Sequence, residues 1–231
     1  MRDSHEPSVG ACSARQFRPA APDFRARAAP RATTRCVRPP YQQPGGNVAF
    51  WTLFGLFVLS EYAMRIRTRA NRVGKAAERW SLAVVVVTIG GGLFAAIRLA
   101  RWHETEVVAA RWVLFGLGLA LMVTGAVVRQ WAVFTLGRFF TVEVRVQPNQ
   151  TVVDRGPYRW VRHPSYTGMI LFLVGVGLAL TNWASLIVLA VAPTIGLLVR
   201  IRSEERVLLA ALGEPYRRYA AQRRRLFPGV W

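Results

Sequence analysis

The sequence predicts an all-α fold, an integral membrane helical bundle of about five transmembrane helices, from three observations. Hydrophobic residues make up 52% of the 231 residues, and most of them lie in five apolar segments. The 31 Lys and Arg residues outnumber the 12 Asp and Glu residues and all lie outside these segments. Membrane proteins have this pattern because Lys and Arg collect in cytoplasmic loops. A protein that binds nucleic acid would instead carry its basic residues on a soluble folded face.

Residues 1–46 form an extension rich in Arg, Ala and Pro that has no hydrophobic period. Such a composition buries too little apolar surface to fold, so we expect disorder over 1–46. The two cysteines of the chain, Cys12 and Cys36, both lie in this extension and do not have the spacing of metal ligands. The three histidines are far apart in sequence. We therefore predict no metal site and no nucleic-acid partner.

Residues 47–128 are predicted to form three transmembrane helices, over 48–64, 80–97 and 112–128. The first segment has 17 residues, or roughly 25 Å of helix, close to the lower limit for crossing the hydrocarbon core. Glycines recur in the second and third segments. Because glycine lets helix backbones approach closely in membranes, we expect these positions to lie at helix contacts: Gly90, Gly91, Gly92, Gly116, Gly118 and Gly125.

Residues 129–231 begin with a polar connector, 129–164, and continue with two apolar segments, 165–180 and 183–199. Only Thr181 and Asn182 separate the two segments, which predicts an antiparallel helical hairpin. A charged tail with a further helix follows. We expect the short join to bring residues 163 and 200 together at the open end of the hairpin.

The charges of the loops predict the orientation of the bundle. The loop at 65–79 is strongly basic, whereas the loop at 98–111 also carries Glu104 and Glu106. The first loop, the connector and the tail are therefore expected in the cytoplasm. The Arg-rich extension at the opposite side disagrees with this orientation. The Arg/Ala-rich composition suggests a multi-pass protein of a bacterial inner membrane.

Two clusters of polar residues flank the predicted hairpin. The first, within 151–168, combines several arginines and His163 with prolines and aromatic residues. Taken alone it could be a basic membrane anchor with an aromatic belt. The second places Arg200 and Glu204 at i and i+4, on one helical face. Taken alone these two could be a surface ion pair. Charged groups that converge at the end of an apolar hairpin predict a functional site.

The same residues resemble the isoprenylcysteine carboxyl methyltransferase family. GPYRWVRHPSYTG at 156–168 matches the family pattern G-x-Y-x-x-x-R-H-P-x-Y-x-G, and RIRSEERVLLAALGEPYRRY at 200–219 matches R-x-x-x-E-E followed by G-x-x-Y-x-x-Y. The resemblance covers about residues 129–228. Over these motifs the matching positions are Gly156, Tyr158, Arg162, His163, Pro164, Tyr166 and Gly168, then Arg200, Glu204, Glu205, Gly213, Tyr216 and Tyr219.

The resemblance implies methyl transfer from S-adenosylmethionine to the carboxylate of a lipophilic, membrane-embedded acceptor. It assigns Arg200 to the acceptor carboxylate and Glu204 to the amino group of the cofactor. It also assigns a set of cofactor-binding positions on the connector and the first hairpin arm: Arg145, Gln150, Thr151, Val152, Val153, Tyr158, His163, Pro164, Ser165 and Tyr166. The resemblance further implies that the connector and the C-terminal helix cap the cofactor site at the open end of the hairpin. The cofactor would enter from the cytoplasm, and the acceptor from the lipid.

Three alternatives stay open on the sequence. A phospholipid N-methyltransferase shares the cofactor and a similar motif, but an amine acceptor has no use for Arg200. A sterol-type reductase uses NADPH and usually reads H-P-N-Y with an acidic residue after the glycine, where this chain has Ser165 and Met169. A membrane anchor without enzymatic activity would tolerate the loss of His163 or Glu204.

Overall fold

The computed structural model describes residues 38–70, 80–140 and 150–227. The chain divides into two units after Arg38, and every helix described below belongs to the second unit, Pro39–Trp231. All the regular elements in the described residues are helical. The α-helices are α1 Pro44–Ala70, α2 Trp80–Leu99, α3 Arg111–Leu136, α4 Pro164–Ala179, α5 Trp183–Leu212 and α6 Glu214–Gln222, and short 3-10 turns lie at Pro40–Gln42, His103–Thr105, Gly137–Phe139 and Gly156–Arg159.

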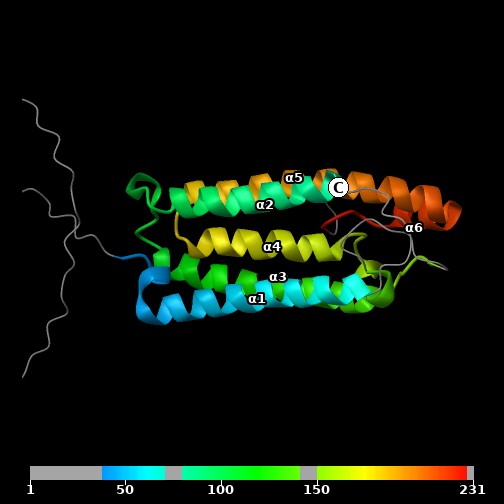
Figure 1. Ribbon diagram of the computed structural model, residues 1–231. Helices are drawn as coiled ribbons and strands as arrows, with labels where there is room; N and C mark the ends of the chain where they lie inside the picture. Colours follow the sequence, from blue (N-terminus) through cyan, green and yellow to red (C-terminus); the bar gives the residue numbers. More distant parts are fainter. Residues whose placement is uncertain (1–37, 71–79, 141–149, 228–231) are drawn as a thin grey trace, which may run out of the picture. The chain divides into compact units, whose positions relative to one another are not determined.

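The long helices form three layers, with α4 as the middle one (Figure 1). Helices α2 and α5 pack together on one side of α4, and α1 and α3 lie on the other side. Most residues of α4 are buried, including Phe172, Leu173 and Val176. The apolar side chains of α4 therefore pack against the neighbouring helices, and the outer helices form the surface that faces away from the bundle.

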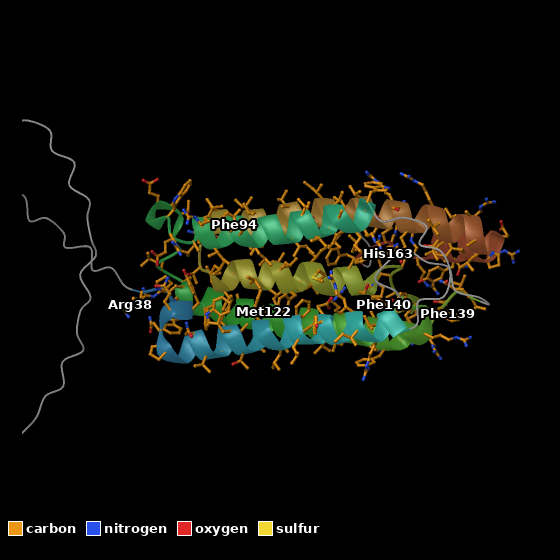
Figure 2. All side chains as sticks on the ribbon, in the orientation of Figure 1. Arg38, Phe94, Met122, Phe139, Phe140 and His163 are labelled. Atoms are coloured by element: carbon orange, nitrogen blue, oxygen red, sulfur yellow. The ribbon has the colours of Figure 1, made fainter. Side chains whose placement is uncertain are left out.

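Apolar side chains cover much of the outer surface of the bundle (Figure 2). Phe94 on α2 is 69% exposed, whereas Met122 on α3 is completely buried between helices. Exposed apolar surface on this scale is unfavourable in water and is what a bilayer covers. In the described part of the chain, four helices are long and apolar enough to cross a membrane: α1 from Pro44 to Arg67, α2, α3 continued to Phe139, and α5.

The predicted all-α membrane bundle is thus confirmed, with a difference in the number of spanning helices. The sequence predicted about five spans, and five apolar helices are present, but α4 has only 16 residues and falls short of the length criterion. A helix of this length extends about 24 Å, and neighbouring helices surround most of it. It can therefore remain shorter than the hydrocarbon core, because protein rather than lipid contacts most of its surface.

Three predicted boundaries were wrong. The third helix ends at Leu136 rather than at residue 128, so Arg129 lies on a helix and not in a polar connector. Helix α5 continues without a break from Trp183 to Leu212, so Arg200 and Glu204 belong to it and not to a separate tail. The expectation of disorder over 1–46 is wrong for residues 40–46, because Pro40 is buried and α1 begins at Pro44. Residues 1–37 lie outside the described part of the chain.

The predicted hairpin is confirmed, with three residues, Leu180, Thr181 and Asn182, between α4 and α5. Asn182 caps α5, since its Oδ1 accepts a hydrogen bond of 3.0 Å from the amide of Ser185. Its Nδ2 donates to the carbonyl oxygens of Leu99 and Trp102 at 3.2 Å and to Thr105 Oγ1 at 2.7 Å. One side chain therefore fixes the start of α5 and ties the α2–α3 loop to the same end of the bundle.

Glycines allow α3 and α4 to cross at backbone contact. A Cβ atom on Gly118 would lie 2.6 Å from the amide nitrogen of Ala179, and one on Gly125 would lie 2.4 Å from that of Phe172. The expectation of close packing is correct at these two positions. It is wrong for Gly116, Gly90 and Gly91, where an added Cβ would have no heavy atom within 4 Å. Gly92 is intermediate, since its Cβ would be 3.7 Å from Pro193.

We predict that Gly125→Ala destabilises the bundle by about 1–3 kcal/mol, because the new methyl group overlaps the backbone of α4. Gly116→Ala on the same helix serves as the control and should be neutral or stabilising by up to about 1 kcal/mol, because alanine is the better helix former. Thermal unfolding of the two variants in detergent measures the difference. Equal shifts in the midpoint would show that α3 and α4 do not cross at Gly125.

Candidate active site

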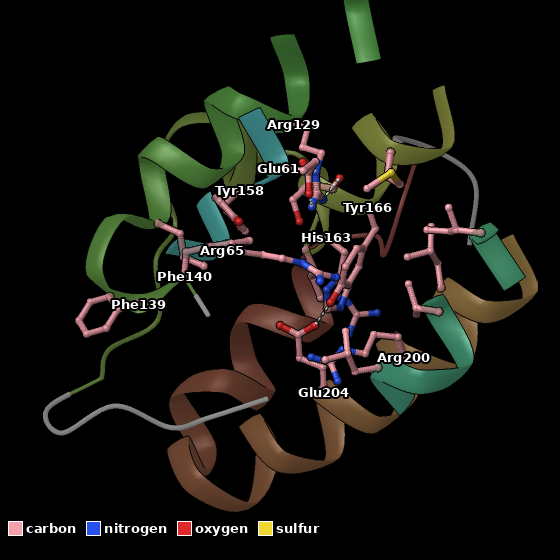
Figure 3. Close-up of a pocket in the computed structure, with 18 of the residues that line it drawn as sticks. Glu61, Arg65, Arg129, Phe139, Phe140, Tyr158, His163, Tyr166, Arg200 and Glu204 are labelled. Carbon is pink, nitrogen blue, oxygen red and sulfur yellow. Dashed lines mark hydrogen bonds and ion pairs between the residues drawn. The ribbon is translucent and has the colours of Figure 1, made fainter. Parts of the chain in front are cut away.

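A cavity of about 530 Å³ opens between the layers at the end of the bundle where α4 begins and α5 approaches α6 (Figure 3). All the α-helices and the segment before α4 contribute to its walls. One part of the wall carries charged residues and tyrosines, and the other part is apolar. A cavity of this size is within the range that binds small ligands.

Helix α5 supplies the charged residues that the two sequence motifs predicted. Arg200 and Glu204 both line the cavity, one helical turn apart, and Arg200 is only 3% exposed. Arg200 Nη1 donates a hydrogen bond of 2.7 Å to Ser81 Oγ on α2. The hydroxyl of Tyr166 on α4 donates one of 2.7 Å to Glu204 Oε2. These contacts hold both groups at fixed positions, so they are not a surface ion pair.

A second carboxylate, Glu205, binds two arginines and a histidine behind the cavity wall. Its Oε1 lies 2.9 Å from Arg162 Nη1 and 3.2 Å from His163 Nε2, and its Oε2 lies 3.1 Å from Arg225 Nε. The ring of His163 in turn stacks on Tyr166 with 5.6 Å between centroids. Glu205 therefore connects the two feet of the hairpin with the end of the chain and fixes the ring that supports Tyr166.

The chain beyond α6 returns to the start of α4. The amides of Arg162 and His163 donate to the carbonyl oxygens of Arg224 and Arg225 at 2.8 and 3.0 Å. Thr167 Oγ1 donates to the carbonyl oxygen of Leu226 at 2.6 Å, and the side chain of Leu226 is buried against α4 and α5. The predicted cap at the open end of the hairpin is thus formed by hydrogen bonds as well as by apolar contact.

Tyrosines surround the charged part of the cavity. Tyr158, Tyr216 and Tyr219 line it together with Tyr166, and the Tyr219 hydroxyl donates to the carbonyl oxygen of Tyr158 at 2.8 Å. Burial raises the pKa of Tyr158, Tyr216 and Tyr219 well above the usual value of a phenol. These side chains therefore remain neutral at physiological pH and present aromatic faces to whatever occupies the cavity.

An ion pair between α1 and α3 lies on the wall opposite α5 (Figure 3). Both oxygens of the Glu61 carboxylate accept hydrogen bonds from Arg129, from Nε to Oε1 and from Nη2 to Oε2, the latter at 2.6 Å. Arg129 Nη1 donates to the carbonyl oxygen of Ser165 at 3.2 Å. Both side chains line the cavity. The sequence analysis did not include them among the site residues, although an acidic residue inside an apolar segment is a signal that could have found Glu61.

The remaining wall of the cavity is apolar and reaches towards the middle of the bundle. Phe57 on α1 stacks on Phe172 on α4 with 3.7 Å between ring centroids. Val58 on α1 and Val86 on α2 line the cavity and are each 49% exposed. The cavity therefore reaches the outer, lipid-facing surface between α1 and α2, and we call this part the apolar arm.

Most of the residues that the sequence assigned to cofactor binding lie around this cavity. Arg145 lies outside the described residues, and Pro164 is buried at the start of α4 but does not line the cavity. The sequence motifs therefore identified one contiguous site, which the structure builds from these predicted positions: Gln150, Thr151, Val152, Val153, Tyr158, His163, Ser165, Tyr166, Arg200 and Glu204.

Comparison with known proteins places this region in a family. Residues 118–210 match the sequence model of the isoprenylcysteine carboxyl methyltransferase (ICMT) family. The part of the chain that carries the two site motifs therefore resembles this family in sequence. The ICMT match begins within α3 and ends within α5, so it includes α4 and the residues Arg200 and Glu204. Helices α1 and α2 lie outside it.

Individual ICMT relatives match over the same half of the chain. Protein-S-isoprenylcysteine O-methyltransferase B of Arabidopsis thaliana is 34% identical over 111 residues, 47% of this chain and 56% of the relative. An uncharacterized protein of Bacillus subtilis is 31% identical over 93 residues, 40% of this chain and 55% of that protein. The chain thus spans about half the length of the curated relatives that it matches.

A solved structure supports the fold over a larger part of the chain. The eukaryotic intramembrane Ras methyltransferase ICMT superposes with a TM-score of 0.63, covering 84% of this chain and 70% of that structure. The sequence identity of 24% limits this likeness to the fold. It includes more of the chain than the ICMT sequence match does, so the likeness of fold extends beyond the segment in which the motifs lie.

We predict that Glu205→Ala destabilises the protein by about 3–5 kcal/mol, because it leaves several buried cations without their carboxylate. The end of the chain should then detach, and trypsin should cleave after Arg224 and Arg225 at lower concentrations. Glu214→Ala is the control: its ion pairs with Arg217 and Arg218 are exposed, so stability should change by no more than about 0.5 kcal/mol. Similar melting and cleavage of both variants would contradict the role of Glu205.

Proposed function

We propose that this protein transfers the methyl group of S-adenosylmethionine to the carboxylate of a lipophilic acceptor in the membrane. One observation carries the proposal. Arg200 and Glu204 meet Tyr166 at the charged end of a cavity whose other end is an apolar arm open to the lipid-facing surface. A water-soluble donor and a lipid-soluble acceptor need a site with these two kinds of wall.

The residues around the charged end fit the proposed cofactor. Glu204 is a carboxylate that can pair with the ammonium group of the methionine part. Neutral tyrosine rings can face a sulfonium, because a cation is attracted to the face of an aromatic ring. The four residues 150–153, which line the cavity and belong to no helix, offer backbone groups for the nucleoside. The cavity volume of about 530 Å³ is sufficient for a ligand of this kind.

Arg200 is the group that we assign to the acceptor. A guanidinium binds a carboxylate through two parallel N–H donors and keeps its charge at any physiological pH. Its hydrogen bond to Ser81 fixes the guanidinium between α2 and α5. An acceptor held there keeps an oxygen lone pair that is not engaged by Arg200 and can be directed at the methyl group.

The reaction requires the protein to align the donor and the acceptor, and it does not require a general base. When bound, the cofactor supplies a methyl group on a positively charged sulfur, so that a C–O bond forms as the C–S bond breaks and no proton is transferred. Arg200 orients the ionised acceptor, Glu204 and Tyr166 orient the donor, and the buried tyrosines exclude water. Proximity and exclusion of water of this kind can supply much of the rate of a two-substrate reaction.

The acceptor that we propose resembles an isoprenylcysteine in its chemistry, with an apolar chain beside a free carboxylate. The apolar arm would hold the chain, and Arg200 the carboxylate. An amine acceptor such as a phospholipid head group would require an anionic partner at the position of Arg200. This residue therefore favours an acid over an amine.

We also propose that the charged end of the cavity faces the cytoplasm. Helix α1 ends and α2 begins at the same end of the bundle as Arg200 and Glu204. The sequence that joins these two helices is strongly basic. The opposite end carries the less basic loop that contacts Asn182. Loop charge and the position of the site thus agree, in line with the tendency of basic loops to remain inside.

The orientation can be tested with cysteine labelling in cells. In a chain carrying Cys12→Ser and Cys36→Ser, a cysteine replacing the exposed Val108 should react with a membrane-impermeant thiol reagent, and one replacing the exposed Arg218 should be protected until the membrane is permeabilised. The reverse labelling pattern would place the site outside the cell.

The two charged residues on α5 should differ in what they bind. Glu204→Ala should weaken the binding of S-adenosylmethionine, whereas Arg200→Ala should weaken the use of the acceptor and leave cofactor binding intact. Each loss removes a charge-assisted hydrogen bond of about 1.5–3 kcal/mol, so affinities should fall roughly ten- to a hundredfold. Arg202→Ala, an exposed arginine on the same helix, should change neither.

Calorimetry with S-adenosylmethionine and with NADPH measures these affinities and tests the proposed function at the same time. Binding of S-adenosylmethionine by the unmodified protein, lost in Glu204→Ala only, is the expected result. Binding of NADPH in place of S-adenosylmethionine would support a reductase and overturn the methyltransferase proposal.

A further inference from the structure

The ion pair between Glu61 and Arg129 places in the cavity an arginine that the proposed transfer does not use. Arg129 is 7% exposed, and it lines the same cavity as Arg200. Figure 3 shows these two arginines on opposite sides of Tyr166 and His163.

Two further arginines, Arg65 and Arg162, also line the cavity, and Arg162 is paired with Glu205. An acceptor carboxylate that enters the cavity therefore meets more than one guanidinium group, and Arg200 is the one that lies one helical turn from Glu204.

Glu61 occupies the carboxylate-binding edge of Arg129. The two side chains form a bidentate pair, Nε to Oε1 and Nη2 to Oε2, and the remaining terminal nitrogen donates to the carbonyl oxygen of Ser165. All three nitrogens of Arg129 are thus engaged by oxygen atoms of the protein. Bidentate binding of this kind uses the same fork that an acceptor carboxylate would use.

We infer that Glu61 is a specificity-determining residue that keeps the acceptor carboxylate away from Arg129 and so directs it to Arg200. The inference rests on the proposed function, since it concerns the acid that the enzyme would methylate. A carboxylate bound to Arg129 would lie on the wrong wall of the cavity and would not react. Glu61 prevents this binding by occupying the guanidinium itself.

The position of the pair suits this role better than that of a simple tether between helices. The neighbouring residues already provide a tether, since Gln130 Nε2 donates to Ser60 Oγ at 2.8 Å between the same two helices. Ser60 and Gln130 do not line the cavity, whereas Glu61 and Arg129 do. Glu61 also lies outside the segment that matches the ICMT family, as expected for a residue that selects among acceptors rather than one that performs the transfer.

Removing the charge of Glu61 should create unproductive binding. In Glu61→Gln an acceptor can bind to Arg129 as well as to Arg200, so kcat and KM should both fall, each on the order of tenfold, while kcat/KM changes by less than about twofold. Calorimetry with a lipophilic acid in the absence of the donor should show tighter binding by about the same factor. The affinity for S-adenosylmethionine should not change.

The double variant Glu61→Gln/Arg129→Gln is the decisive control. It removes the competing guanidinium and replaces the pair with two neutral amides that can still form hydrogen bonds to each other. We expect kcat, KM and acid affinity to return to within about threefold of the unmodified protein, since the guanidinium that Glu61→Gln exposes is then gone. Ser60→Ala, which removes only the neighbouring tether, should leave all three quantities unchanged.

Other outcomes would overturn the inference. If Glu61→Gln raises KM or lowers kcat/KM tenfold, and the double variant is as impaired as the single one, the pair supports the structure and does not direct the acceptor. Should Glu61→Gln fail to fold, Glu61→Asp withdraws the carboxylate by one methylene and must shift kcat and KM in the same directions. An unmodified protein that methylates no acid at all would contradict the proposed function instead, so the two failures can be distinguished.

Discussion

The charged end of the cavity depends on the pairing of arginines inside an apolar bundle. A guanidinium among hydrocarbon side chains is costly unless oxygen atoms of the protein surround it. Here the partners come from other elements: Glu61 binds Arg129, Glu205 binds Arg162 and Arg225, and Ser81 accepts from Arg200. Each of these contacts joins two or more segments that are distant in sequence. The same interactions that make the charges tolerable therefore also bring the walls of the site together.

Helix α4 determines where that end of the cavity forms. The close crossing with α3 at Gly118 and Gly125 fixes the position of α4 along the axis of the bundle, and the short join to α5 fixes its direction. Its first turn then carries Tyr166 to Glu204, and the preceding His163 to Glu205. Because α4 is buried on most sides, it can be shorter than a membrane-spanning helix and leave room at its beginning for the connector, the tail and a ligand.

Much of this site could be predicted from the sequence because the motifs are local. His163 and Tyr166 precede a predicted hairpin, Arg200 and Glu204 follow it, and a join of two residues forces these ends together. The helix boundaries were harder, since Arg129 ends an apolar segment by composition, yet hydrogen bonds continue α3 to Leu136. Hydropathy assigns a charged residue such as Arg129 to a loop, because it does not account for a partner such as Glu61 that allows the charge to lie on a membrane helix.

The residues that α1 and α2 contact across the bundle could not be predicted. Glu61 and Arg129 are 68 residues apart, and nothing in the composition of either segment indicates which helix faces which. The same holds for the apolar arm, where Phe57 meets Phe172 across the bundle. Hydrophobic pattern predicts that a helix is in the membrane, but a nearly uniform apolar surface has no period that identifies its buried side. Only the packing of the whole bundle resolves these contacts.

The central claim is that the product is a methyl ester of a membrane-embedded acid. Purified protein in detergent is incubated with S-adenosylmethionine labelled in its methyl group and with a synthetic thioether acid that carries an isoprenoid chain. The labelled product is then extracted and treated with mild alkali. The account predicts lipid-soluble label that alkali releases as volatile methanol, and none when the acid is replaced by its amide. Label that remains on the lipid after alkali, as in a methylated amine, would contradict it.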